Sequence, residues 1–371
     1  MSKPIRVLQI IGLSCGGGVE SVIMNYYRHV DKRKVQFDFV VHKNPLKTLV
    51  DEAISMGAKV YEVTPYTQNI IKFTYEIYKI IKDGNYQIVH SNMNSLSGFP
   101  LLAAYFAGAK VRILHNHTTD TKEEGLRTTI KRLLRPFAKV FANQNWACSK
   151  LAGEWMYGKE AVENEKVTII NNAIDLDKFA FNKDKRDEFR KKLGVEGKFV
   201  VGHVGRFMKQ KNHEFLIDIF AEVAKEKENA VLILIGDGPL MGLIKEKVSN
   251  LNLNDKVNFL GVRSDVADLY NVMDLFVLPS FYEGLPVVGV ESQANGLPIL
   301  CSNNVTNEVV LSKAIELLDL GSGSKYWSEV VLRSSVYGRI ETREEIAKIG
   351  FSIGEESKNL ESIYRSLLLR M

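Results

Sequence analysis

Hydrophobic residues in this chain form short runs that alternate with longer amphipathic segments. The first apolar runs are residues 5–12, 35–42 and 59–63, and segments of helical period separate them at residues 20–30 and 46–57. Short apolar runs of this kind indicate buried strands, and the longer periodic segments indicate helices. The order strand, helix, strand, helix, strand predicts a parallel, doubly wound sheet.

A second alternating series begins at residue 199. Its expected strands are residues 199–204, 231–236, 257–261, 275–280 and 298–302. Two such series predict an α/β protein with two Rossmann-like, doubly wound domains, and a chain of 371 residues fits the usual domain size of roughly 150 residues. Because residues 181–198 are charged and poor in large apolar side chains, we expect domains at residues 1–185 and 186–350. Residues 351–371 are expected to form a helix that returns to the first domain.

Composition limits the class of protein. Hydrophobic residues make up 45% and charged residues 25%, which suits a globular chain with two cores. A net charge of +5 is mild for this length, so it favours anionic small molecules over nucleic acid. The three cysteines lack CxxC spacing, no leader precedes the first strand, and no apolar run reaches the roughly 20 residues that span a bilayer. We therefore expect a cytoplasmic protein.

The segment EGLPVVGVE, residues 283–291, carries two glutamates across a predicted strand-to-helix turn. Such turns lie at the carboxyl ends of parallel strands, where open α/β folds bind ligands. Gly284 allows the backbone to approach a ligand, and Pro286 stiffens the turn. Glu283 and Glu291 are therefore candidates for holding sugar hydroxyls, although glutamates are more often exposed surface acids.

The segment GRFMKQKN, residues 205–212, lies between an expected strand and an expected helix. Arg206 can bind two phosphate oxygens at once, Lys211 supplies a point charge, and a helix starting near Asn212 would direct its first amides at an anion. The alternative is a pair of solvated surface cations. The pattern favours a diphosphate site.

These segments occur in a fixed order: GRFMKQKN, LILIGDGPL, FLGVRSDVADLYNVMDLFVLPS and EGLPVVGVE. The set resembles the retaining family-4 glycosyltransferases of the GT-B fold, in which two Rossmann-like domains face a cleft. The segments IRVLQIIG, SCGGGVES, VRILHNHTT, WACSK and IINNAIDLDKF fit this family more loosely. One departure is CSNNVTNEVV, which stands where the family has a glycine-rich turn and a glutamate.

The resemblance implies roles for individual residues. Glu283 would contact the donor sugar, Glu291 the ribose, and the amide of Leu285 the phosphate. The glycines of the first loop would admit the donor phosphate, although a simple tight turn is the alternative, and Glu20 would cap the helix or meet the acceptor. The expected donor-binding residues are Gly16, Gly17, Gly18, Gly205, Arg206, Lys211, Val262, Gly284, Leu285 and Glu291, and the expected catalytic residues are His117, Glu283, Arg206 and Lys211.

His115 and His117 follow an expected strand in the polar segment HNHTT. The resemblance assigns the contact with the donor sugar to His117 in preference to His115. A zinc site is the alternative, but two imidazoles with no third ligand nearby make a weak case. Asp175 and Asp177 resemble a metal-binding DxD triplet of another glycosyltransferase architecture. Because cations are available for the diphosphate, we expect no metal and no cofactor.

Taken with the resemblance, the motifs predict a retaining glycosyltransferase that moves a sugar from a nucleotide sugar, expected to be a UDP-sugar, to a hydroxyl of a cell-surface glycan or lipid-linked precursor. One alternative is a catalytically inactive nucleotide-sugar-binding subunit, which the intact set of cations and glutamates disfavours. A Rossmann-type oxidoreductase is the other, and CGGGVES lacks the GxGxxG pattern that it would need.

Residues 126–141, LRTTIKRLLRPFAKVF, predict an amphipathic helix without acidic residues. Its apolar stripe consists of Leu126, Ile130, Leu133, Leu134 and Phe137, and its flanking cations are Arg127, Lys131, Arg132, Arg135 and Lys139. Such a helix can lie on an anionic membrane surface, which would make the protein peripheral on the inner face of the membrane. An ordinary domain helix with its stripe in the core is the alternative.

Overall fold

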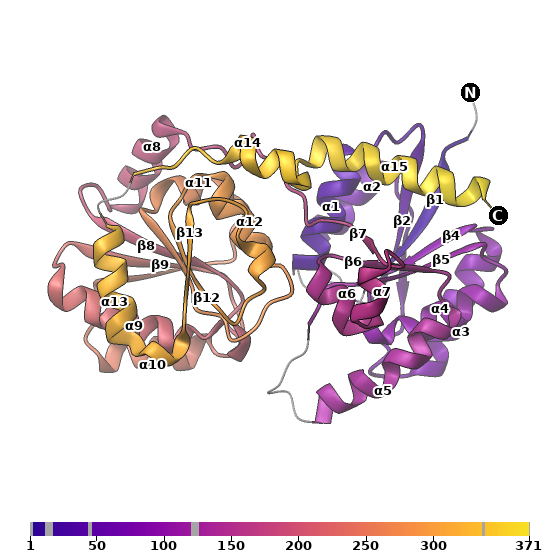
Figure 1. Cartoon of the computed structure of the whole chain (residues 1–371), viewed down its shortest axis with the longest axis horizontal. Helices are drawn as coiled ribbons and strands as arrows, with labels where there is room; N and C mark the ends of the chain where they lie inside the picture. Colours follow the sequence, from indigo (N-terminus) through magenta and orange to yellow (C-terminus); the bar gives the residue numbers. More distant parts are fainter. Residues whose placement is uncertain (1–2, 12–17, 44–46, 120–125, 336–337, 371) are drawn as a thin grey trace. The chain divides into compact units, whose positions relative to one another are not determined.

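The computed structural model describes residues 3–11, 18–43, 47–119, 126–335 and 338–370 (Figure 1). The chain consists of two compact units. Met1–Ala173 and Ile353–Met371 form the N-terminal unit, and Ile174–Ser352 form the C-terminal unit. The two domains expected from the alternating pattern are present, and the chain passes between them at residues 173/174 and 352/353.

A parallel sheet of seven strands forms the centre of the N-terminal unit, in the order β3-β2-β1-β4-β5-β6-β7. The strands are β1 Ile5–Ile10, β2 Val35–His42, β3 Val60–Val63, β4 Ile88–Ser91, β5 Val111–Asn116, β6 Gln144–Ala147 and β7 Thr168–Ile169. Every residue of β2 is buried, as expected for a parallel strand covered on both faces.

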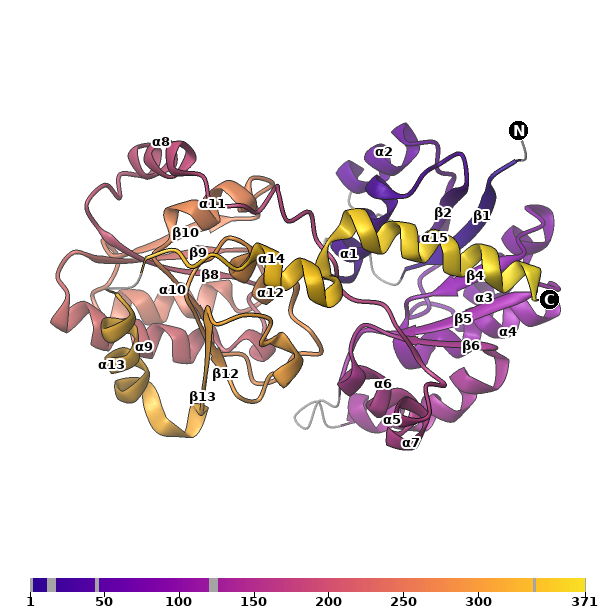
Figure 2. The same ribbon diagram turned by 45° about the horizontal axis from the view of Figure 1, so that its top comes forward.

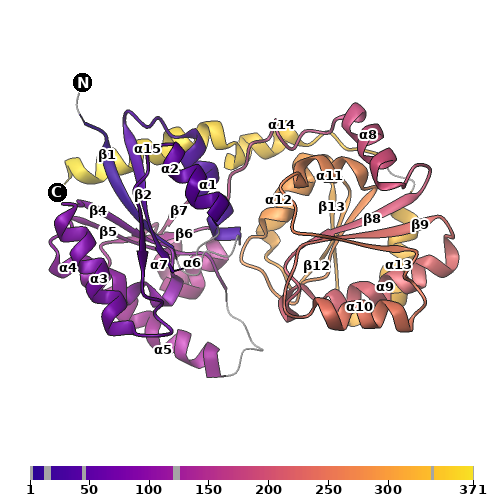
Figure 3. The same ribbon diagram turned by 180° about the vertical axis from the view of Figure 1, so that it is seen from behind.

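Helices cover both faces of this sheet (Figures 1 and 3). They are α1 Gly18–His29, α2 Lys47–Ser55, α3 Ile70–Asp83, α4 Gly98–Phe106, α5 Leu126–Phe141, α6 Lys150–Tyr157, α7 Lys159–Glu163 and α15 Ile353–Leu369, with the 3-10 turn Asn94–Ser97 before α4. Leu8 and Ile10 of β1 pack with residues of α3 and α4 in one core cluster. The last helix, α15, packs against α1 on the N-terminal unit (Figure 2).

The C-terminal unit contains a parallel sheet of six strands in the order β10-β9-β8-β11-β12-β13. The strands are β8 Phe199–Val204, β9 Ala230–Ile235, β10 Val257–Gly261, β11 Leu275–Leu278, β12 Ile299–Ser302 and β13 Ile315–Leu318. The longer helices are α8 Lys183–Leu193, α9 His213–Glu226, α10 Met241–Asn250, α11 Val266–Val272, α12 Val287–Ala294 and α13 Gly323–Ser334. The shorter turns are Lys209–Lys211, Asn307–Val309 and Leu320–Ser322, followed by α14 Arg343–Ile346 and the π-helical turn Ala347–Phe351.

The charged segment expected to lie at the domain boundary is instead largely the helix α8. Asn182 caps its first turn, and Gly194, in the left-handed region at φ 66°, ends it. Arg186 and Arg190 of this helix both donate to the carboxylate of Asp274, at 2.5 and 2.6 Å. These contacts attach α8 to the C-terminal unit.

Counted from its own first strand, each sheet has the order 3-2-1-4-5-6, and β7 adds a seventh strand to the N-terminal sheet. The order reverses between β1 and β4 in the N-terminal unit and between β8 and β11 in the C-terminal unit. Ligands of doubly wound sheets bind outside the carboxyl ends of the strands at such a reversal point. The residues that follow these strands are therefore the first candidates for a functional site.

Candidate active site

The loop after β8 leads from the sheet to the start of α9. Gly236, in the loop after β9, has φ +133°, and a Cβ atom there would lie 2.1 Å from the carbonyl oxygen of Gly205. The loops after β8 and β9 therefore pack backbone against backbone, which requires glycine at this position. Arg206 is exposed on the loop after β8. Asn212 adopts left-handed geometry and α9 begins at His213, and the Asn212 side chain makes no capping hydrogen bond to the first amides of the helix. A helix amino terminus in this state favours an anion.

Glu283 is the most firmly held acidic side chain of the expected set. Its Oε1 lies 2.6 Å from Nζ of Lys211 and accepts a hydrogen bond from the Ser280 hydroxyl at 3.0 Å. Its Oε2 accepts from the side-chain amide of Gln210 at 3.0 Å. The Glu283 side chain is only 10% exposed, so these partners compensate for the loss of water around the carboxylate. These contacts join the loops after β8 and β11.

Glu291 lies on α12, which begins after Pro286. Its carboxylate accepts a hydrogen bond of 2.9 Å from the hydroxyl of Tyr270 on α11. Burial raises the pKa of Glu291 to about 7, and the hydrogen bond from Tyr270, together with Lys178 and Lys211, opposes that rise. Glu291 can therefore exchange a proton near neutral pH.

His115 and His117 take part in a buried polar network of the N-terminal unit. His115 is the penultimate residue of β5 and is only 4% exposed, whereas His117 follows the strand and is less buried. Nε2 of His117 lies 3.0 Å from Oδ1 of Asn92, and the two imidazole rings stack with centroids 4.1 Å apart. Burial lowers the pKa of His117 to about 3 and lowers that of His115 well below its usual range. Both rings are therefore neutral near pH 7.

The other expected site residues fall into three groups. Gly16 and Gly17 lie outside the described residues, and Gly18 is the exposed first residue of α1. Leu285 is buried in the turn before α12. Val262 is 77% exposed in the turn after β10.

Several residues at these positions were not predicted. Gln210 and Ser280 lie within the quoted motifs, and their polar character could have suggested partners for Glu283. Tyr270 gives no such signal, because it precedes Glu291 by 21 residues and belongs to another helix. Asn92 also gives none, since its relation to His117 depends on the pairing of β4 with β5.

The DLD triplet takes part in local contacts of the C-terminal unit. Oδ1 of Asp175 accepts a hydrogen bond of 3.1 Å from the amide of Lys178, which closes a turn. Asp177 lies 3.6 Å from Arg343 and is 98% exposed at its side chain. Within the part of the chain that the structure describes, no group of three or more His, Cys, Asp or Glu side chains is arranged to hold a metal ion.

Two sequence families match the chain. Residues 16–178 match Glycosyltransferase Family 4, and residues 184–316 match Glycosyl transferases group 1. EpsF of Bacillus subtilis, which is named as a glycosyltransferase, is 35% identical over 98% of this chain and 97% of its own length. The UDP-Gal:alpha-D-GlcNAc-diphosphoundecaprenol alpha-1,3-galactosyltransferase of Escherichia coli is 29% identical, with 86% of each chain covered.

Solved structures share the fold. HepE of Anabaena, solved in complex with UDP and glucose, aligns with a TM-score of 0.81 at 20% identity, over 98% of this chain and 100% of that chain. The fold and the sequence matches together define the chain as an enzyme, a glycosyltransferase of the GT-B fold. The resemblance drawn from the motifs is confirmed: the chain belongs to glycosyltransferase family 4.

Proposed function

We propose that this glycosyltransferase moves a sugar from a UDP-sugar to a hydroxyl of a cell-surface glycan or lipid-linked precursor, with retention of the anomeric configuration. The observation that carries the proposal is the pairing of Lys211 with Glu283 beside the start of α9, at the reversal point of the C-terminal sheet. A cation and the first amides of a helix suit a diphosphate, and a carboxylate held by hydrogen bonds suits sugar hydroxyls. The named activity of the Escherichia coli relative and the UDP bound to HepE support the choice of donor.

Each residue has a distinct part in this proposal. The diphosphate is held by Arg206, Lys211, the first amides of α9 and the amide of Leu285. Its approach is allowed by the glycines Gly16, Gly17, Gly18, Gly205 and Gly284. Glu283 binds the sugar, and Glu291 binds the ribose hydroxyls. Val262 lines the nucleotide. His117 contacts the donor sugar.

The reaction proposed is a front-side displacement. The bond between the anomeric carbon and the leaving phosphate oxygen breaks, and the acceptor oxygen forms its bond to that carbon on the same face. The acceptor proton passes to the leaving phosphate oxygen. Because negative charge develops on that phosphate, Arg206 and Lys211 stabilise the transition state more than the bound donor. With these cations on the diphosphate, the transfer is proposed to need no metal, so activity should survive EDTA.

A donor screen tests the proposal. The purified chain would be mixed with UDP-, GDP- and ADP-sugars in a thermal-shift assay, and the stabilising donor would then be used for transfer to a lipid-linked acceptor. We expect a UDP-sugar to raise the melting temperature of the protein. NMR of the product should show that the transferred sugar keeps the anomeric configuration that it had in the donor. Transfer with inversion would refute retention. Binding of a UDP-sugar without transfer to any acceptor or to water would favour the inactive nucleotide-sugar-binding subunit.

We also propose that α5 takes part in a peripheral membrane contact. Ile130 and Leu133 are 46% and 73% exposed, and Val140 is 71% exposed. The neighbouring helix α4 adds exposed Tyr105 and Phe106. Exposed apolar side chains gathered on adjacent helices are typical of a binding surface. Within the described residues no helix is long and apolar enough to cross a membrane.

The apolar stripe expected on α5 does not act as one surface. Phe137 packs against Phe99 and Phe141, with ring centroids 5.2 and 5.5 Å away, and Ala138 is fully buried. The helix therefore uses part of its apolar side for the core, which corrects the single stripe that the sequence suggested. The side chains of Leu126, Arg127 and Lys131 lie outside the described residues. Arg135 lies over the Trp155 ring at 5.1 Å, so it contributes to packing.

A further inference from the structure

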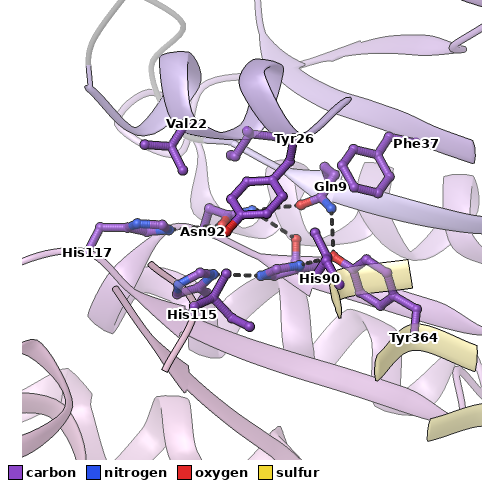
Figure 4. Close-up of a pocket in the computed structure, with 12 residues that line it drawn as sticks. Gln9, Val22, Tyr26, Phe37, His90, Asn92, His115, His117 and Tyr364 are labelled. Atoms are coloured by element: carbon purple, nitrogen blue, oxygen red, sulfur yellow. Dashed lines mark hydrogen bonds between the residues drawn. The ribbon is translucent and has the colours of Figure 1, made fainter. Parts of the chain in front are cut away.

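A chain of neutral polar side chains connects α15 with the carboxyl ends of three strands in the N-terminal unit (Figure 4). One part of it leads to His117. The side-chain amide of Gln9 on β1 donates to the hydroxyl of Tyr364 at 3.1 Å, and the amide of Asn92 donates to Oε1 of Gln9 at 3.0 Å. Oδ1 of Asn92 then lies 3.0 Å from Nε2 of His117.

The orientation of the Asn92 amide fixes the position of a proton on His117. Nδ2 of Asn92 also lies 3.4 Å from the backbone carbonyl oxygen of His90, which can only accept a hydrogen bond. Turning the amide over would place its oxygen against that carbonyl. Oδ1 therefore faces His117 and accepts, so the proton of the neutral imidazole is on Nε2. Nδ1 is left with a lone pair, and within the described residues it has no hydrogen-bond partner.

The second part of the network runs from Tyr364 through His90 to His115, and its donors and acceptors can be assigned in the same way. Because Gln9 donates to the oxygen of Tyr364, the Tyr364 hydroxyl is free to donate to Nδ1 of His90, at 2.7 Å. Nε2 of His90 then donates to Nδ1 of His115, at 3.0 Å. The proton of His115 is consequently on Nε2, a buried atom that has no hydrogen-bond partner among the described residues. Under this assignment every hydrogen bond of the network joins one donor to one acceptor.

We propose that Gln9, Asn92 and Tyr364 are positioning residues that hold His117 as its Nε2–H tautomer, so that Nδ1 accepts a hydrogen bond from a hydroxyl of the donor sugar. This inference rests on the proposed contact between His117 and that sugar. A rigid acceptor discriminates a hydroxyl from a group that cannot donate. The hydrogen-bond network also links α15, the last helix of the chain, to His117, because Tyr364 of this helix is fully buried within it.

The tautomer can be measured directly. Long-range ¹H–¹⁵N spectra of the full chain, labelled at histidine, distinguish a protonated from an unprotonated ring nitrogen, and loss of one spin system in His117→Gln assigns His117. We expect Nε2–H with bare Nδ1 at neutral pH, and the same pattern in the presence of UDP. An Nδ1–H tautomer in the wild-type protein would overturn the proposal.

Asn92→Leu removes the acceptor while keeping the approximate size of the side chain. We expect the Nδ1–H tautomer of His117 to become populated and kcat to fall about tenfold, with UDP affinity unchanged, because one oriented hydrogen bond to the sugar is lost. Tyr364→Phe should shift the tautomer in the same direction by a smaller amount. The matched control is Tyr27→Phe, which removes a hydroxyl that donates a hydrogen bond of 3.0 Å to the backbone carbonyl oxygen of Met56. This change should leave the His117 spectrum and kcat unchanged.

Asn92→Asp provides a second variant with a different signature. A carboxylate keeps an acceptor for Nε2–H, so the tautomer should be retained at high pH, although its second oxygen replaces the donor to Gln9 and to the His90 carbonyl. The added negative charge should raise the pKa of His117, and protonation of Nδ1 then removes the acceptor. The titratable groups lining the same cavity are His90, His115, Tyr26 and Tyr364. In the pH profile of kcat, we expect the decrease on the acid side to begin at a higher pH in Asn92→Asp than in the wild-type protein.

The outcomes separate this inference from the proposed function. A His117 tautomer that is Nε2–H and responds to Asn92→Leu, in a protein whose His117→Ala variant keeps full transfer activity, would support the positioning network and refute the sugar contact. If His117→Ala abolished transfer while Asn92→Leu left the His117 tautomer unchanged, the sugar contact would be supported and the positioning network refuted. Identical pH profiles for Asn92→Asp and wild type would also overturn the positioning role.

Discussion

The two units place opposite kinds of polar group at the same point of the same fold. At the carboxyl ends of β1, β4 and β5, the N-terminal unit gathers neutral imidazoles, amides and a tyrosine hydroxyl. After β8 and β11, the C-terminal unit gathers a lysine and a glutamate in contact. Since the strand orders are equivalent, the fold selects the place and the residues after each strand select the chemistry.

Burial has different consequences for the two groups. The histidines lose their charge because no carboxylate among the described residues stabilises an imidazolium beside them, and burial alone lowers the pKa of His117. Lys211 and Glu283 keep a salt bridge because the carboxylate has two further hydrogen-bond donors. The C-terminal unit is thus suited to a charged diphosphate, and the N-terminal unit to neutral hydroxyls.

The largest effect should come from the charged unit. Lys211→Met should lower kcat/KM by about 10²–10³-fold, the usual effect of removing one preorganised charge stabiliser. It also leaves the Glu283 carboxylate without its cation, so the free energy of unfolding should fall by about 2–3 kcal/mol. Arg206→Met removes an exposed cation instead, and should lose similar activity with a stability change within about 0.5 kcal/mol.

Steady-state kinetics and urea unfolding measure both quantities. The double variant Lys211→Met with Glu283→Gln should regain stability without activity, because a neutral amide no longer needs a cation. Wild-type turnover in either single cation variant would remove these residues from the diphosphate site.

The neutral unit should show a division between its two histidines. His117→Ala should reduce transfer about tenfold to a hundredfold while UDP affinity stays near the wild-type value, because the proposed contact is with the sugar. His115→Ala should instead lower the free energy of unfolding by about 2 kcal/mol, since it leaves Nε2 of His90 unpaired and opens a cavity. Isothermal titration with UDP and with the UDP-sugar distinguishes the two. Equal changes in both affinities in both variants would contradict this division.

Local signals in the sequence predicted most strands and the two loops that carry Lys211 and Glu283. The run 199–204 is β8 itself, because a strand buried on both faces is mostly apolar, and His203 is its one polar side chain. Lys211 and Glu283 were expected at one site and are in contact, since each follows a strand at the sheet reversal. These features depend on neighbours in the sequence.

Features that depend on distant partners were not predictable. The segment around α8 was expected to be a boundary because it is charged and poor in large apolar residues. Its attachment to the C-terminal unit depends on Asp274, which lies 84 residues beyond Arg190 and could not be recognised as its partner from the sequence. The hydrogen bond from Tyr270 to Glu291 and the network from Tyr364 to His117 also join separate elements. Periodicity carries no information about such pairs, and no motif marks them.

Glu291 should give the charged unit a pH dependence near neutrality. Its pKa of about 7 lies above the value in the unfolded chain, so the folded protein binds an extra proton between the two values. Stability from this group is therefore fully present below the unfolded pKa and is lost as pH rises towards about 7, by up to about 3 kcal/mol. UDP affinity should change in the opposite direction, because the carboxylate accepts ribose hydroxyls.

Thermal melts and UDP titrations at a series of pH values measure this dependence. Glu291→Gln should remove the transition in both. Tyr270→Phe should move it to higher pH, because the hydrogen bond from Tyr270 favours the charged form. A wild-type UDP affinity that is flat across neutral pH would show that Glu291 does not bind the ribose in its ionised form.

The smallest effect should come from the exposed side of α5. Leu133→Glu or Val140→Glu should weaken cosedimentation with anionic vesicles about tenfold at low salt, because each change removes an apolar side chain from the lipid surface. Both side chains are more than two-thirds exposed, so folding should be unaffected. Leu243→Glu is the matched control, since Leu243 is 53% exposed on α10 of the C-terminal unit. Equal losses in the control, or equal binding to neutral and anionic vesicles, would leave α5 as an ordinary domain helix.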